Sequence, residues 1–419
     1  MQRQHLVPWL VLVFSALTCR PPAGLAAPGA AVPPEDAAVK LARSSNAFGF
    51  DLYQRLRQAP GNFVMSPASI ATALNMAWGG AQGETAAQMR KVLHLEGTAD
   101  EVMAASGQLA RSLQDPARPV VFRIANQLFG DKTYKLVPAF VEKTRAAFGA
   151  PVELLDFKTK PEQARGHINQ WVEGKTEHRI ANLIPPGALV PGTRLVLVNA
   201  IYFLGDWDTP FEREATRSAP FHLTASEKKD VPTMNRTGGF RIAHKDGVTA
   251  LEIPYKGRQL SMMLLVPDDV QGLAAVEGAL DARKLEALAG AMQMETVWLS
   301  LPKFEVKPDE SLALGEPLKA LGMALAFDRK KADFTGIANP PNPDDRLVVS
   351  DVFHKGFVKV DEKGTEAAAA TALSMMVRGA MAEEPPRRLN ADRPFLFLIR
   401  DKASGLVLFL GRVSDPSRR

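Results

Sequence analysis

Apolar side chains recur at the spacing of an amphipathic helix over residues 36–57, where Leu41 and Phe48 share one face. A second helix is expected after Ser66, because a serine followed by Pro67 is a strong helix start. That helix is apolar on most sides, so it should be buried. Further helices are predicted over residues 100–114, 138–148, 161–173, 271–289 (as one or two helices) and 311–321.

Short runs rich in β-branched and aromatic residues predict strands between and after these helices. The longest runs are residues 193–204 and 347–360, and residues 395–400 and 406–413 form a hairpin. Residues 220–267 alternate short strands with turns, as in an antiparallel sheet. Shorter strands are predicted over residues 62–65, 120–129 and 297–307. No repeat or linker divides the chain, so one α+β domain is expected over residues 36–419.

Residues 1–27 have the features of a secretory signal. Arg3 gives a positive start, and residues 6–17 are largely apolar but too short to span a bilayer. We therefore expect a secreted or periplasmic protein. Cleavage after residue 26 or 27 would remove Cys19, the only cysteine, and leave a chain that needs no disulfide. The alternative is a lipid-modified Cys19, the only route by which the sequence predicts a membrane attachment.

Composition narrows the class of protein. A hydrophobic content of 46% in 419 residues supports a large core, and a net charge of +5 is too mild to argue for nucleic-acid binding. The seven histidines lack metal-ligand spacing. No phosphate loop, Gly-x-Ser-x-Gly elbow or His-Glu-x-x-His motif is present. The sequence therefore predicts no enzyme, no cofactor and no metal.

The most informative stretch is Asp361 to Arg378, which leaves the long predicted strand. Its first half has only small side chains apart from Glu366. Alanine favours a helix, but alanines and threonines would also fit between two strands without a steric penalty. Arg378 is the only basic residue between Lys363 and Arg387. The stretch should be exposed, with Arg378 as bait for a protease.

This stretch carries a resemblance to a known family. Residues 362–370 read Glu-Lys-Gly-Thr-Glu-Ala-Ala-Ala-Ala, which resembles the reactive-loop hinge of serpins, the suicide inhibitors of serine proteases. Residues 62–89 and 199–207 also resemble serpins, and residues 36–416 follow the serpin order. The residues that match the hinge are Glu362, Gly364, Thr365, Glu366, Ala367, Ala368, Ala369 and Ala370. The resemblance implies three β-sheets, eight to nine helices and an exposed reactive loop at about residues 362–386.

The resemblance also implies a mechanism and a partner. A target serine protease cleaves the loop and stays bound as a covalent acyl complex, while the loop enters the main sheet. Counting 17 residues from Glu362 places the bond between Arg378 and Gly379, which suits a trypsin-like pocket. The segment formed by residues 379–393 is longer than usual for the family. Three other residues therefore remain candidates for the cleavage site, namely Met375, Met376 and Val377. We expect an exported, monomeric inhibitor from a bacterium; the alternative is a non-inhibitory carrier or chaperone.

Alternation along a strand predicts which loop residues face the core after insertion. Thr365, Ala367, Ala369 and Thr371 should face inward, and Glu366 outward. We therefore expect Thr365→Arg to impair insertion while leaving folding intact.

Four further residues match the family's "shutter", the part of the sheet that opens: Ser66, Ser69, Asn199 and His354. The resemblance implies a hydrogen bond between His354 and Asn199. Trp207 matches another family position, and a plain role in the core explains it equally well.

Overall fold

The computed structural model describes residues 36–149, 152–365 and 385–418, and Asp36–Arg419 form one compact unit. The described ranges contain nine α-helices and two hydrogen-bonded β-sheets. None of these helices is both long enough and apolar enough to cross a bilayer. The helices are α1 (Ala37–Leu56), α2 (Pro67–Trp78), α3 (Gly83–Val92), α4 (Ala99–Leu113), α5 (Pro138–Phe148), α6 (Pro161–Lys175), α7 (Leu273–Ala279), α8 (Ala282–Ala291) and α9 (Gly315–Leu321).

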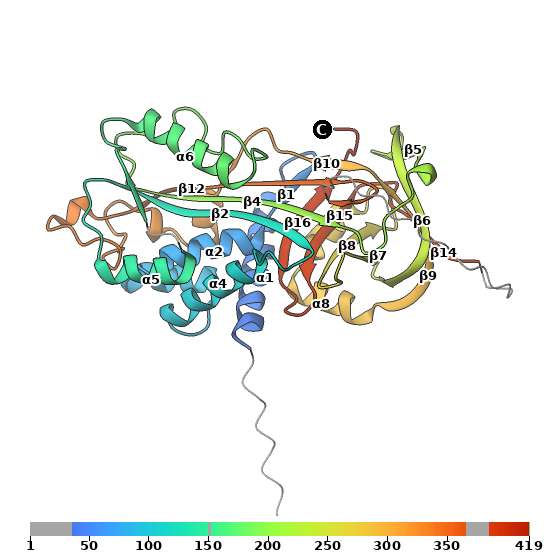
Figure 1. The fold of residues 1–419 in the computed structure, drawn as a ribbon, viewed down its shortest axis with the longest axis horizontal. Helices are drawn as coiled ribbons and strands as arrows, with labels where there is room; N and C mark the ends of the chain where they lie inside the picture. The colour runs from blue at the N-terminus through green and yellow to red at the C-terminus, as the bar shows by residue number, and fades with distance from the viewer. Residues whose placement is uncertain (1–35, 150–151, 366–384, 419) are drawn as a thin grey trace, which may run out of the picture. The chain divides into compact units, whose positions relative to one another are not determined.

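The first sheet holds the strand that leads into the predicted reactive loop. Its order is β10–β12–β13–β4–β2–β3, with β11 beside β12. The long strands β12 and β4 run parallel, and β2 is antiparallel to β4. Figure 1 shows α6 over one face of this sheet and α2, α4 and α5 under the other. The strands are β2 (Val120–Asp131), β3 (Glu153–Leu155), β4 (Leu195–Asp206), β10 (Phe304–Val306), β11 (Leu312–Ala313), β12 (Val349–Val360) and β13 (Gly364–Thr365).

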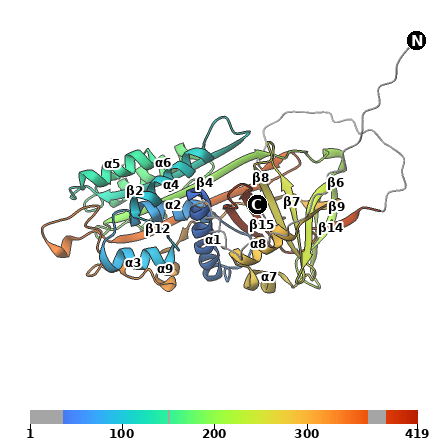
Figure 2. The ribbon, with the colours of Figure 1, turned by 90° about the horizontal axis from the view of Figure 1, so that it is seen from below.

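The other two of the three expected sheets are joined into one hydrogen-bonded sheet by the long strand β6. This second sheet runs β1–β16–β15–β8–β7–β6–β9–β14, with β5 beside β6. The long strand β6 pairs with β5 at its start and with β7 at its end, so it belongs to an outer and an inner part. In Figure 2, β6, β9 and β14 lie together beyond β7 and β8. The strands are β1 (Phe63–Met65), β5 (Arg217–His222), β6 (Lys228–Lys245), β7 (Val248–Pro254), β8 (Leu260–Pro267), β9 (Gln293–Pro302), β14 (Arg387–Asn390), β15 (Phe395–Asp401) and β16 (Val407–Val413).

Strand β4 is buried on both faces, which explains its unbroken apolar sequence. Leu197, Ile201 and Phe203 point to the face that carries the two largest buried clusters, together called the main core, whereas Val198 and Tyr202 belong to a third cluster. That cluster is completed by α6 and the segment after it. The two faces of β4 therefore have different cover, a packed core on one side and α6 on the other.

Helix starts were predicted well where a capping residue marks them. Ser66 caps α2 by accepting a hydrogen bond from the backbone of Ser69, and every residue of α2 is buried. Helix α3 was not predicted, and its N-cap, Gln82, makes no capping hydrogen bond. The helix expected over residues 311–321 is wrong in its first part, because Leu312 and Ala313 pair with β12 as a short strand.

Candidate functional site

The hinge of the predicted loop is already seated in the sheet. Strand β13 lies between β12 and β4 and is antiparallel to both: Thr365 pairs with Gly205 and with Val360, and Gly364 pairs with Asp206. A Cβ atom at Gly364 would overlap the carbonyl oxygen of Gly205, so the close approach requires glycine. The first hinge residues therefore form a short strand at one end of the gap between β12 and β4.

Thr365 is fully buried in this arrangement. Its hydroxyl lies 2.7 Å from the hydroxyl of Tyr255, whose ring stacks on Trp207 with centroids 4.6 Å apart. Burial raises the pKa of Tyr255, so the phenol stays protonated. The expectation that the loop is exposed from residue 362 is wrong here, as Glu362, Gly364 and Thr365 are all buried. Because Thr365 is already buried, Thr365→Arg would bury a charge in the intact protein, so we expect this substitution to impair folding as well as insertion.

The residues just before β13 are held by side chains from three other segments. A Glu362 carboxylate oxygen lies 2.8 Å from the Lys303 ammonium, and the other accepts a hydrogen bond from Thr216. Burial opposes ionisation of Glu362, but the hydrogen bonds from Lys303 and Thr216 help to lower its pKa below the usual value. The indole of Trp207 donates to the Asp361 carbonyl at 3.0 Å. Trp207 is thus both a core residue and an anchor for the base of the loop.

A row of polar side chains crosses the sheet below the hinge. Asn126 on β2 pairs in register with Asn199 on β4, which pairs with His354 on β12. The Ser66 backbone N–H donates to Nε2 of His354 at 3.1 Å, so the ring proton is on Nδ1, which donates to Asn199 Oδ1. Asn199 also donates to the Ser69 hydroxyl at 2.5 Å and to Asn126.

The four predicted shutter residues are therefore brought together, and burial lowers the pKa of His354 to about 3, which keeps the imidazole neutral. Sequence reasoning missed Asn126, which also accepts from the Ser69 hydroxyl at 3.1 Å. Its signal was available, because an asparagine in the middle of an apolar strand needs a buried partner.

The remaining predicted site residues lie outside the described ranges. They are Glu366, Ala367, Ala368, Ala369, Ala370, Arg378 and Gly379, together with Thr371 and the alternative baits Met375, Met376 and Val377. Among the residues that are described, no three His, Cys, Asp or Glu side chains gather as a metal site.

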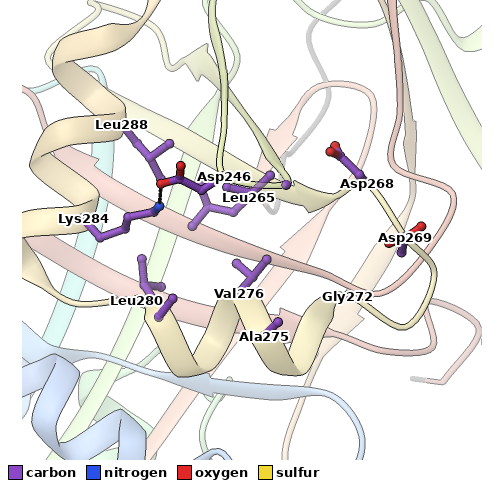
Figure 3. Close-up of a pocket in the computed structure, with 13 residues that line it drawn as sticks. Asp246, Leu265, Asp268, Asp269, Gly272, Ala275, Val276, Leu280, Lys284 and Leu288 are labelled. Carbon is purple, nitrogen blue, oxygen red and sulfur yellow. Dashed lines mark hydrogen bonds and ion pairs between the residues drawn. The ribbon is translucent and has the colours of Figure 1, made fainter.

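A cavity of about 370 Å³ lies between α7, α8 and the turn from β6 to β7 (Figure 3). Val276, Leu280 and Leu288 are among its apolar walls, and Lys284 forms an ion pair with Asp246 at its edge. None of the predicted site residues lines this cavity.

Comparison with known proteins places this geometry in a family. The family model described as "Serpin (serine protease inhibitor)" matches residues 43–416. Leukocyte elastase inhibitor of Equus caballus is 38% identical over 387 residues, covering 90% of this chain and 100% of that protein. Iris of Ixodes ricinus is 39% identical, covering 88% of this chain and 97% of that protein.

Solved structures agree with the sequence relatives. Serpin48 of Tenebrio molitor superposes with a TM-score of 0.80 at 32% identity, covering 90% of this chain and 98% of that one. Human thyroxine-binding globulin gives a TM-score of 0.81 at 27% identity, covering 91% of this chain and 100% of that one. The fold prediction of three sheets with eight to nine helices is confirmed, and the chain belongs to the serpin family.

Proposed function

We propose that the protein is a suicide inhibitor of serine proteases that traps its target by inserting the cleaved loop between β12 and β4. The observation that carries this proposal is strand β13, which already lies antiparallel to both neighbours. Extending β13 would replace one parallel pairing with two antiparallel ladders. Antiparallel pairing is slightly more stable per residue, so the extension is favourable in its hydrogen bonding.

The register of β13 fixes where later loop residues would arrive. Since Thr365 faces Gly205, residue 367 would face Phe203, residue 369 would face Ile201 and residue 371 would face Asn199. These β4 residues point inward, toward the main core and the shutter contacts. The inward loop positions hold Ala367, Ala369 and Thr371, which are small enough to enter between two strands. Small side chains at these inward positions support the proposal.

Insertion has to break a defined set of contacts. The parallel pairing of β12 with β4 extends from Val349 to Phe357, and it includes the pair of His354 with Asn199. Thr371 would arrive level with Asn199, so its hydroxyl could replace part of the lost hydrogen bonding. Ile168 and Val172 on α6 pack in the outer cluster that covers this region, so the helix has to yield as the strand enters.

The chemistry is that of an interrupted acyl transfer. The protease serine attacks the carbonyl carbon of Arg378, the amine of Gly379 leaves, and an ester joins the two proteins. Insertion of residues 366–378 then carries the ester about 43 Å along the sheet, at ~3.3 Å per residue. Arginine suits a trypsin-like pocket, whose buried carboxylate pairs with the guanidinium.

The test is to mix the protein with trypsin and look for a covalent adduct that survives boiling in detergent. Mass spectrometry of the released peptide should place the cut after Arg378. Arg378→Ala should slow association with trypsin about 30- to 4000-fold, because the pocket carboxylate loses its partner. Active trypsin with only cleaved protein would favour the carrier or chaperone reading, and a cut after Met375, Met376 or Val377 would correct the bait.

We also propose that the protein acts as an exported monomer, because residues 1–27 have the charge and apolar pattern of a secretory signal. N-terminal sequencing of protein recovered outside the cytoplasm should find a start after residue 26 or 27. A chain that keeps residues 1–27 would contradict export by this signal.

A further inference from the structure

Two of the three exposed large hydrophobic side chains in the described ranges lie on the same strand. Met294 is 69% exposed and Trp298 is 39% exposed, and both belong to β9. Residues four apart on a strand point to the same face. A tryptophan and a methionine that are both exposed on one face of a strand, about 13 Å apart at ~3.3 Å per residue, are informative, because exposed apolar groups on one face mark contact surfaces.

A cation completes this face. Arg388 on β14 pairs in register with Trp298, and its guanidinium lies 5.9 Å from the centre of the indole ring. The neighbouring Arg387 pairs with Glu295 at 3.2 Å, whereas Arg388 has no carboxylate partner among the described residues. Tryptophan, methionine and arginine are the side chains that are enriched at protein interfaces. We call Met294, Trp298 and Arg388 the β9 face.

The return end of the reactive loop is attached at β9, where Arg387 pairs in register with Val297. The hinge at the departing end is held near the end of the same strand, because Glu362 pairs with Lys303, the residue that follows β9. Lys303 and Val297 are six residues apart, or about 20 Å. A protease that holds a bond between residues 366 and 384 is therefore bound to a segment whose return end pairs with the strand that carries Trp298.

We propose that the β9 face is a second contact surface for the target protease, and that it fits a protease with carboxylates and an apolar patch beside its substrate cleft. The proposal rests on the proposed function, since it takes a serine protease as the occupant. Arg388 would pair with an acidic group of the protease, and Trp298 with Met294 would pack against its apolar rim. The face would then set which trypsin-like enzymes dock quickly, while Arg378 sets the class of pocket.

The experiment measures equilibrium docking to trypsin whose active-site serine is replaced by alanine, so that neither cleavage nor insertion contributes. Trp298→Thr should raise Kd about 10- to 100-fold, as expected for a central aromatic contact. Trp298→Phe should stay within about threefold of wild type, because it keeps the ring. Val190→Thr is the matched control, since Val190 is 47% exposed and precedes the end of β4 opposite the hinge. Equal melting temperatures show that each variant is folded.

Charge is tested with anionic and cationic trypsin, which share primary specificity. Arg388→Gln should weaken docking to the anionic form about tenfold and leave the cationic form nearly unchanged. Equal effects on both forms, or a Trp298→Thr variant that docks like wild type, would overturn the β9 face. A wild-type dimer that dissociates on Trp298→Thr would also overturn it, because the occupant would then be a second copy.

The two proposals fail in different ways. If docking depends on the β9 face but no covalent adduct forms, the trapping mechanism is wrong and the β9 face is upheld. If an adduct forms but docking does not depend on the β9 face, the trapping mechanism is upheld and the β9 face is wrong. If the wild-type protein binds neither inactive trypsin nor inactive elastase nor inactive chymotrypsin, both proposals are wrong.

Discussion

Three polar side chains, Asn126, Asn199 and His354, hold together three strands whose other inward positions are apolar. His354 is fully buried, so its neutral ring can form the shutter hydrogen bonds without the cost of a buried charge. The ring accepts from Ser66 at one nitrogen and donates to Asn199 from the other. Protonation would turn the accepting nitrogen into a donor that faces another N–H. At the scale of single residues, this set of hydrogen bonds therefore requires a neutral histidine.

This arrangement predicts a specific sensitivity to acid. Burial lowers the pKa of His354 from 6.5 to about 3. Between these two pH values, His354 is therefore protonated in the unfolded chain and neutral in the folded chain. Stability should fall as the pH drops from 6.5 toward 3, by up to about 1.4 kcal/mol per pH unit from this residue. Urea unfolding at pH 7 and pH 5 should show the loss in wild type and a smaller loss in His354→Gln.

His94→Gln is the control for that measurement, because His94 is exposed and pairs with Asp51 at the surface. The unfolding free energy of His94→Gln should fall between pH 7 and pH 5 as much as that of the wild type. An equal loss of unfolding free energy between pH 7 and pH 5 in the wild type and in His354→Gln would mean that this histidine does not couple folding to pH.

At the scale of elements, the two residues of β13 define the register of the whole proposed insertion. Residue 367 would face Phe203 in the main core, whereas residue 368 would face Tyr202 in the cluster under α6. Thr365 cannot serve as the test position, because it is already buried in the intact protein. Substitutions further along the loop avoid this problem.

Ala367→Glu and Ala368→Glu form a matched pair of variants with predictions of different size. A glutamate at the inward position would bury an unpaired charge in the packed core, at a cost of about 3–5 kcal/mol, so insertion should slow and trypsin should escape. Residue 368 would lie opposite Tyr202 under α6, which has to yield as the strand enters, so a glutamate there should impair insertion less. The measurement is the number of inhibitor molecules consumed per trypsin inhibited. A larger increase for Ala368→Glu would mean that the register is wrong.

The sequence was informative where local chemistry decides structure. Ser66 with Pro67 predicted the start of α2, and the apolar run over residues 193–204 predicted β4. It was less informative where tertiary contacts decide, since the described residues of β13, Gly364 and Thr365, form a strand because β12 and β4 flank them. Asn126 stood out as a polar residue in a predicted strand, but its partner could not be predicted, because only the register of β2 with β4 brings it to Asn199. The β9 face could not be predicted either, because β14 pairs with β9 across about ninety residues of chain.

At the scale of the whole molecule, the proposal requires the intact fold to be less stable than the fold with its loop inserted. In the intact protein the central pair of β12 and β4 is parallel, and of the residues that the structure describes, Gly364 and Thr365 lie between these strands beyond the end of that pairing. Under this proposal the intact state would persist because the barrier to opening is high, which is kinetic stability. Cleavage between residues 366 and 384 would release the loop from its return anchor at β14 and allow the rearrangement.

The most direct test of this claim is the melting temperature of the intact protein compared with that of protein cleaved after Arg378 and purified from any adduct. Insertion worth several kcal/mol should raise the melting temperature of the cleaved form by about 10 °C or more. Cleaved Ala367→Glu should lose most of this gain, because its inserted strand carries a buried charge. A cleaved wild-type protein that melts at or below the temperature of the intact protein would contradict insertion between β12 and β4.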